Sequence, residues 1–71
     1  MSLSVDTVVL AAKVREKRSN LGLTKSDLAS LVGSSPSTIG RIEAKKSYPS
    51  TDLFISLCNW LKTDPRDFVR G

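Results

Sequence analysis

The sequence predicts an all-α fold made of five short helices. Three features of the 71-residue chain support this prediction. Apolar residues recur at helical spacing in separate segments, and Ser, Thr or Asp residues that favour helix N-caps stand ahead of these segments. Pro36 and Pro65 follow two of these caps, at the first helical position, where a backbone N–H group is not needed. We therefore expect residues 1–71 to form one small domain, with residues 1–5 as a segment that could be disordered.

The first helix is expected to run from Asp6 to about Leu21, with Asp6 or Ser4 as its N-cap. Its inner stripe consists of Val9 or Leu10, Val14 and Leu21. Arg18 lies on this same stripe, where burying an unpaired cation would be unfavourable. The remaining cations of the helix are expected on a solvated face, with contact of one or two of them with phosphate as the alternative; they are Lys13, Arg15 and Lys17.

The stretch from Thr24 to Lys46 contains two further helices with a break between them. Thr24 is the expected N-cap of the first, Gly33 can adopt the left-handed conformation that ends it, and Ser35 caps the second. Their inward residues are Leu28, Ala29, Leu31, Val32, Ile39 and Ile42. A tight Gly-containing turn between two short helices is typical of the helix-turn-helix unit, whose second helix, here residues 36–45, can lie in the DNA major groove.

The same spacing also suits a purely structural corner between two helices. The types of the exposed residues therefore have to distinguish a DNA-binding unit from such a corner. The second helix presents hydroxyl groups and a guanidinium away from its apolar residues, and lysines follow at its C-terminal end. Such groups donate hydrogen bonds to phosphates and base edges, which favours DNA binding. They belong to Ser37, Thr38, Arg41, Lys45 and Lys46.

Glu43 is a second charge that leans toward the core, because it lies four residues after Ile39. We expect Glu43 to pair with Arg18, since a guanidinium offers a carboxylate a bidentate geometry. The alternative is that both charges lie at the rim of the core and contact water.

A fourth helix is expected from the cap Ser50 to about Lys62, and a short fifth helix after Asp64. The inner stripe of the fourth helix is Leu53, Phe54, Leu57, Cys58 and Leu61. Trp60 falls off this stripe, and Phe68 on the fifth helix either covers the core or contributes to a dimer. Trp60 and Phe68 are therefore the candidate dimer contacts.

The composition narrows the classes of function. Eleven basic against seven acidic residues give a net charge of +4, which favours a polyanionic partner. With one Cys and no His, the chain can form neither an internal disulfide nor a recognisable zinc or catalytic site, so we expect no enzyme, no cofactor and no small-molecule ligand. No apolar run approaches the roughly 18 residues that span a membrane, so a cytoplasmic, nucleoid-associated protein is expected.

From about Leu10 to Val69 the chain resembles the Cro/CI-type helix-turn-helix domains of the xenobiotic-response-element family. The matching segments are VREKRSNLGLT (14–24), LASLVGSS (28–35), STIGRIE (37–43) and YPS (48–50). The resemblance implies a compact five-helix, lambda-repressor-like bundle that binds an operator in double-stranded DNA as a homodimer. It further implies transcription regulation, with repression as the expected output.

Position by position, the resemblance implies roles for individual residues. Lys25 stands where the family often has a Gln that holds a phosphate and braces a base-contacting side chain. Base edges would be faced by Ser37 and Arg41, and the sugar-phosphate backbone by Ser35, Thr38, Lys45 and Lys46. Arg18 and Glu43 match a buried ion pair of some members. Pro36 cannot act as a base-reading Gln, and Lys62 replaces the usual Gly at the end of the fourth helix.

A second class of function is an antitoxin-like or adaptor protein. In that case the main partner would be another protein, bound through Trp60, Phe68 and their neighbours, and DNA binding would be secondary.

Overall fold

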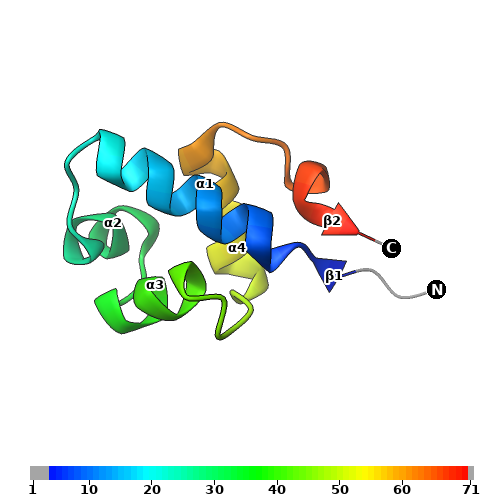
Figure 1. Ribbon diagram of the computed structural model, residues 1–71, viewed down its shortest axis with the longest axis horizontal. Coiled ribbons are helices and arrows are strands. Elements are labelled where there is room, and N and C mark those ends of the chain that lie inside the picture. Colours follow the sequence, from blue (N-terminus) through cyan, green and yellow to red (C-terminus); the bar gives the residue numbers. More distant parts are fainter. Residues whose placement is uncertain (1–3, 71) are drawn as a thin grey trace.

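The computed structural model describes residues 4–70 and is helical, as the sequence predicts (Figure 1). Its elements are β1 (Ser4–Val5), α1 (Thr7–Asn20), α2 (Lys25–Val32), α3 (Pro36–Glu43), α4 (Thr51–Leu61), the 3-10 helix η1 (Pro65–Phe68) and β2 (Val69–Arg70). The all-α helix-turn-helix fold is confirmed, with a single 3-10 turn in place of the expected fifth α-helix. None of the described helices has the length and apolar character to cross a membrane.

Each helix begins at a side chain that accepts a hydrogen bond from the first turn. Asp6 accepts from the backbone N–H of Val9 at 3.1 Å, and Ser50 accepts from that of Leu53 at 3.2 Å. At α2, the Thr24 side chain accepts from the Asp27 N–H while the Asp27 carboxylate accepts from the Thr24 N–H. These contacts satisfy donors that a helix start otherwise leaves without partners, which fixes where each helix begins.

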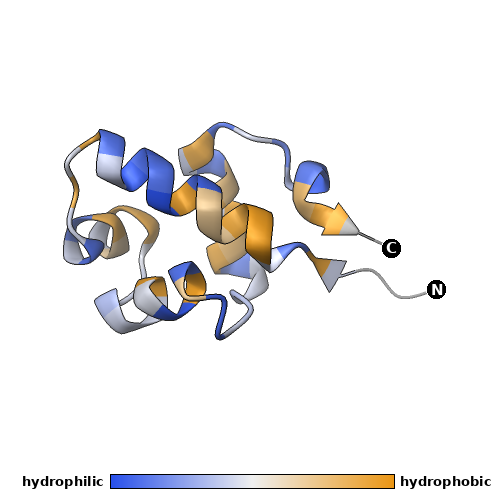
Figure 2. Ribbon diagram, in the orientation of Figure 1, coloured by the Kyte–Doolittle hydropathy of each residue, from blue (hydrophilic) through white to orange (hydrophobic). Residues whose placement is uncertain are grey.

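The core lies where α1, α2, α3 and α4 face one another. Its fully buried side chains are Leu10, Val14, Leu28, Ile39, Leu57, Cys58 and Phe68. The N-terminal half of α1 is apolar and its C-terminal half hydrophilic (Figure 2), so the first half supplies most of that helix's core contacts. Burial in these apolar surroundings raises the pKa of the Cys58 thiol, which is consistent with an inert core residue.

Two leucines that the helical spacing predicts to be in the core are exposed instead. Leu21 is 56% exposed, because it is the C-cap of α1 and lies beyond the last helical turn. Leu31 is 62% exposed, since α2 turns Leu28, Ala29 and Val32 toward the core and leaves Leu31 on the solvent side.

Of the two roles that the sequence left open for Phe68, a cover of the core or a dimer contact, the structure of the single chain fits the first. The Phe68 side chain is 0% exposed and packs edge-to-face on Phe54, with 6.1 Å between ring centroids. Phe68 therefore closes the core from the C-terminal side.

The ends of the described chain pair with each other, which the sequence did not predict. Ser4 is opposite Arg70 and Val5 is opposite Val69 in an antiparallel ladder of two residues per strand. The adjacent N–H of Asp6 donates to the Phe68 carbonyl at 2.6 Å. Both ends of the described chain therefore lie side by side (Figure 1). Of the segment 1–5, Ser4 and Val5 form β1, and residues 1–3 lie outside the described residues.

All four α-helices end at or next to a residue in the left-handed backbone region, and after α1 this residue is Gly22, with φ 70°. Gly33 ends α2 with φ 70°, as expected for a glycine after a helix. Lys62 ends α4 with φ 56°, and Lys45 follows α3 with φ 60°. The helix expected over residues 36–45 therefore ends at Glu43, and Lys45 belongs to the following turn.

Lys17 joins α1 to α4 rather than lying on a solvated face. Its ammonium donates to the Trp60 carbonyl and lies 4.9 Å from the centre of the Trp60 ring. The carbonyl belongs to the last turn of α4, where the helix leaves acceptors without partners and favours a positive charge.

Candidate nucleic-acid interface

α2 and α3 form a helix-turn-helix around Gly33. After Gly33, the N–H of Ser34 donates to the Ala29 carbonyl at 2.8 Å, and Ser35 then caps α3. Ala29 is 2% exposed, and its small side chain allows the two helices to approach closely. Ile39 and Ile42 bury the opposite side of α3, so the remaining face of α3 is directed outward.

Ser37 and Arg41 are exposed on this outward face. Ser37 and Arg41 are one helical turn apart and therefore share one face of α3. Gly40 lies on α3 next to Arg41, and Ala44 is its exposed C-cap, so both add little side chain to this part of the helix. Arg41 is the one side chain on this face that can make a bidentate contact.

Ser35 and Thr38 are tied to each other at the start of α3. The Ser35 hydroxyl accepts from the Thr38 N–H at 3.2 Å, and the two hydroxyl oxygens lie 2.9 Å apart in a further hydrogen bond. This arrangement fixes the first turn of α3 while Ser35 remains exposed.

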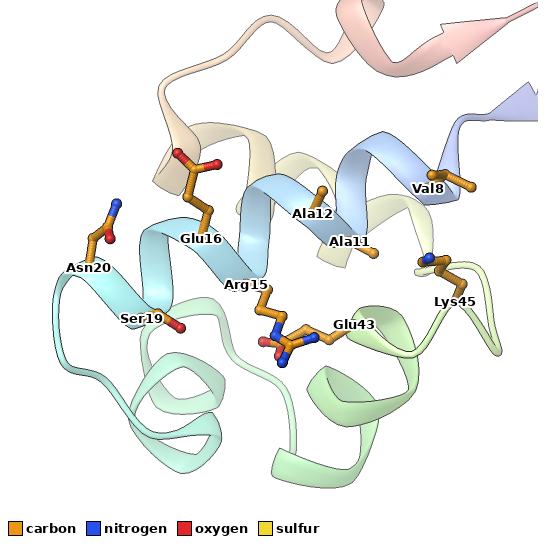
Figure 3. A pocket seen from close by; sticks show the side chains of 9 residues that line it. All are labelled: Val8, Ala11, Ala12, Arg15, Glu16, Ser19, Asn20, Glu43 and Lys45. Carbon is orange, nitrogen blue, oxygen red and sulfur yellow. The ribbon is translucent and has the colours of Figure 1, made fainter.

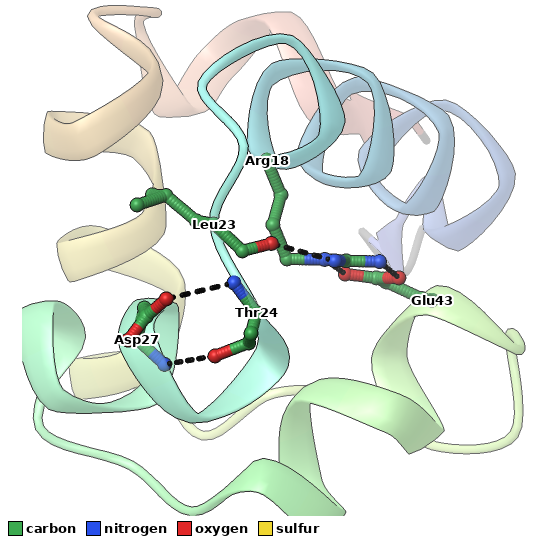
Figure 4. Close-up of polar contacts among 5 residues, drawn as sticks. All are labelled: Arg18, Leu23, Thr24, Asp27 and Glu43. Carbon is green, nitrogen blue, oxygen red and sulfur yellow. Dashed lines mark hydrogen bonds and ion pairs between the residues drawn. The ribbon is translucent and has the colours of Figure 1, made fainter.

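The predicted ion pair between Arg18 and Glu43 is present and holds α3 against α1 (Figure 4). Arg18 Nε donates to one carboxylate oxygen of Glu43 at 2.7 Å, and Nη2 donates to the other at 2.9 Å. Arg18 Nη1 also donates to the Leu23 carbonyl at 2.9 Å. The hydrogen bond to Glu43 raises the pKa of the Arg18 guanidinium, and the two side chains are 16% and 6% exposed.

Three exposed cations lie next to α3. Lys25, the first residue of α2, lies over Gly40: its Nζ and Cδ atoms are 3.7 and 3.9 Å from where a Cβ would stand on Gly40. Lys45 reaches the side of α3 next to α1, where it lines a shallow open hollow with Val8 and Arg15 (Figure 3). Lys46 is exposed in the turn that follows α3.

Two residues near this surface were not predicted as site residues. Tyr48 is 67% exposed on the loop between α3 and α4, and it lines a cleft together with Thr38. Arg15 extends from α1 toward α3 beside Glu43 (Figure 3). A position on α1 carries no signal of proximity to α3 in the sequence, and only the folded chain brings them together.

Among the described residues, no three His, Cys, Asp or Glu side chains gather as a metal site requires. The arrangement instead offers hydroxyl, guanidinium and ammonium donors around one protruding helix. These are the groups that contact phosphates and base edges in protein–DNA complexes.

A family model described as Helix-turn-helix matches residues 14–68. The chain belongs to the Cro/CI-type helix-turn-helix family. A search of curated protein sequences found no match to this chain.

Solved structures of regulators resemble this Cro/CI-type domain. The restriction-modification controller protein C.AhdI from Aeromonas hydrophila is 31% identical, with a TM-score of 0.71 over 87% of this chain and 94% of that one. The clp gene regulator ClgR from Corynebacterium glutamicum is 26% identical, with a TM-score of 0.71 over 90% and 68%. The P22 c2 repressor, solved with a synthetic operator, is 23% identical with a TM-score of 0.72 over 79% and 85%, which shows the shared fold.

Proposed function

We propose that this chain is a transcriptional regulator that binds double-stranded DNA sequence-specifically, with α3 in the major groove. The observation that carries the proposal is the outward face of α3, where Ser37 and Arg41 are exposed while Ile39, Ile42 and Glu43 anchor the helix. Family membership supports it, as does the likeness to a controller protein and to a repressor solved with its operator.

Arg41 carries the main base contact in this proposal. A guanidinium can donate two parallel hydrogen bonds to O6 and N7 of guanine, and Pro36 removes the other reading position of the helix. Ser37 adds a hydrogen bond to a neighbouring base edge. Backbone contacts come from Lys25, Ser35, Thr38, Lys45 and Lys46, which fix the register of α3 without reading sequence.

The regulator acts as a homodimer on an operator with twofold symmetry. Two copies present their α3 helices in successive major grooves, about 34 Å apart. Trp60, which is half-buried against the core, is a candidate contact of that dimer, whereas Phe68 is not. Occupying a promoter in this way represses transcription, needs no cofactor and takes place at the nucleoid in the cytoplasm.

Selection of bound sites from random duplex DNA tests the proposal. The selected pool should contain a half-site, its inverted repeat and a fixed spacing between them. Arg41→Ala should relax the preference at one base pair, worth about 1 to 3 kcal/mol. Lys46→Ala should weaken all sequences alike and reduce the slope of log K against log salt by about 0.9.

Thermal unfolding is the control that shows whether Arg41→Ala and Lys46→Ala are folded. Thermal unfolding of both variants should match that of the unchanged protein, because neither side chain is buried. A selection that enriches no sequence, with the protein folded, would contradict sequence-specific binding and favour a protein partner.

A further inference from the structure

The outer side of α1 borders a shallow hollow of about 520 Å³, which we call the α1 hollow (Figure 3). Val8 in the first turn of α1 and Asn20 in the last turn both line it. The hollow therefore runs about 18 Å along the helix, at 1.5 Å per residue. Glu43 at the end of α3 and Lys45 in the following turn line its other side. This space is long enough for a second helix to lie along α1.

Part of the α1 hollow is apolar. Val8 is 58% exposed, Ala12 is exposed as well, and the buried Ala11 lines the hollow with them. Covering exposed apolar atoms is favourable. The alanines also leave room for the backbone of another helix, because the axes of two packed helices lie only about 8 to 10 Å apart. A phosphodiester backbone gains nothing from apolar atoms, so this part of the hollow suits a protein better than DNA.

The charges around the α1 hollow are not compensated within the described chain. Arg15 and Lys45 are exposed and form no ion pair with a described residue. Glu43 does not balance them, because both of its carboxylate oxygens are bonded to Arg18. Glu16 is exposed on the α1 side of the hollow and also forms no ion pair with a described residue. A partner that carries two carboxylates and one cation complements this pattern.

We propose that the α1 hollow docks an amphipathic helix of a partner protein, with an apolar side chain on Val8 and Ala12 and carboxylates on Arg15 and Lys45. Lys45 is also one of the residues that contact the DNA backbone in the proposed function, so the inference rests on that function in this respect. The partner helix and the operator need the same ammonium group. The docked partner therefore releases the regulator from its operator.

A displayed library of helices of about 14 residues, the length of α1, tests the docking. One face of each helix is randomised, and the library is selected on the unchanged protein. The enriched helices should carry Asp or Glu together with Leu or Ile at spacings of three and four residues, which place these side chains on one face. A synthetic copy of the most enriched helix is then titrated against variants of the protein by fluorescence anisotropy.

Val8→Ser and Arg15→Gln should each weaken binding of the synthetic helix several-fold. Their matched controls are Leu31→Ser, which removes a similarly exposed apolar side chain from α2, and Lys13→Gln, which removes a cation of α1 that does not line the hollow. Both controls should bind the helix like the unchanged protein. All four side chains are exposed, so thermal unfolding should find the four variants as stable as the unchanged protein.

Competition with the selected operator tests the release. The synthetic helix should displace the duplex from the unchanged protein. Val8→Ser should keep its affinity for the operator and resist displacement by the helix, because Val8 belongs to the docking surface alone. Lys45→Ala should weaken binding of the operator and of the helix together.

The outcomes separate this inference from the proposed function. A library that yields no helix, or helices that bind Val8→Ser and Arg15→Gln as tightly as the controls, would overturn the docking and leave the regulator standing. Simultaneous binding of helix and duplex would overturn the release. If no duplex is selected while the helix still depends on Val8 and Arg15, the regulator fails and the docking surface stands. If Val8→Ser splits the homodimer in sedimentation, a second copy of this chain occupies the hollow, which overturns a separate partner.

Discussion

At the scale of single residues, Arg18 joins three segments that are distant in the sequence. Its guanidinium contacts the carboxylate of Glu43 on α3 and the carbonyl of Leu23 in the loop before α2. Its Nε, Nη1 and Nη2 atoms each donate to one of these acceptors. The carboxylate compensates the charge of the guanidinium, although the Arg18 side chain is 16% exposed. One side chain of α1 therefore helps to hold the proposed reading helix in place, together with the buried Ile39 and Ile42.

Arg18→Ala should lower the free energy of unfolding by about 2 to 4 kcal/mol, because it leaves the largely buried carboxylate of Glu43 without a partner. Chemical denaturation at neutral pH measures the change. Arg66→Ala is the control, since the pair that Arg66 forms with Asp64 is exposed and should contribute little. Equal effects of the two substitutions would show that the buried pair does not fix α3.

The ion pair of Arg18 and Glu43 could be predicted from the sequence, because both residues interrupt stripes of apolar residues at helical spacing. The same reasoning failed for Lys17, whose partner is a backbone carbonyl of α4. A carbonyl has no signature in the sequence, so a cation that caps a distant helix looks like any solvated lysine. The sequence did not predict that Arg15 lies near α3 for a similar reason, since this proximity depends on the angle at which the helices cross.

At the scale of elements, the helix starts were predictable and the helix ends were less so. Thr24, Ser35, Ser50 and Asp64 each cap the element that the sequence assigned to them. A cap is a contact over two or three residues, so local sequence determines it. The ends of α3 and α4 depend on whether the tertiary structure allows Lys45 and Lys62 to adopt the left-handed conformation. The two-residue strands are too short to show any periodicity.

Lys62→Gly should stabilise the fold by about 1 kcal/mol, because a residue with a Cβ is strained in the left-handed conformation and glycine is not. Thermal unfolding measures the gain. Lys62→Ala removes the same charge but keeps the Cβ, so it should give no comparable increase. A similar rise for both variants would point to charge instead of backbone conformation.

The capping box of α2 predicts a pH dependence. Hydrogen bonds from Thr24 hold the pKa of the Asp27 carboxyl below its usual range. Because the folded pKa is the lower one, this stabilisation is present above the unfolded value of about 3.9 and is lost as the pH falls through the folded value. Stability curves against pH should be flatter on the acid side for Asp27→Asn. Superimposable curves would mean that the carboxylate does not stabilise α2.

At the scale of the whole molecule, the fold and the outward face of α3 followed from the sequence, while the surfaces around them did not. Phe68 shows the reason, because apolar residues on a short terminal segment could either cover the core or contact a second subunit. Only the packing of Phe68 on Phe54 in the folded chain distinguishes these two roles. Which surface pairs two copies depends on contacts that no single helix specifies.

Symmetric binding makes a geometric prediction for the proposed dimer. Inserting about five base pairs between the half-sites turns them to opposite faces of the duplex and should abolish joint binding, whereas about ten should partly restore it. Gel-shift titrations on the two insertions measure this. Equal affinity for both insertions and for an isolated half-site would mean that each copy binds alone.

The packing of Lys17 on Trp60 gives the domain an internal optical reporter. Trp60 is the one tryptophan of the chain, and an ammonium lies 4.9 Å from the centre of its indole ring, where α1 meets α4. Its emission should therefore change when these two helices separate during unfolding. Because this joint involves neither α2 nor α3, duplex bound along α3 by a single copy should leave the spectrum nearly unaltered, whereas pairing of two copies through Trp60 should change it.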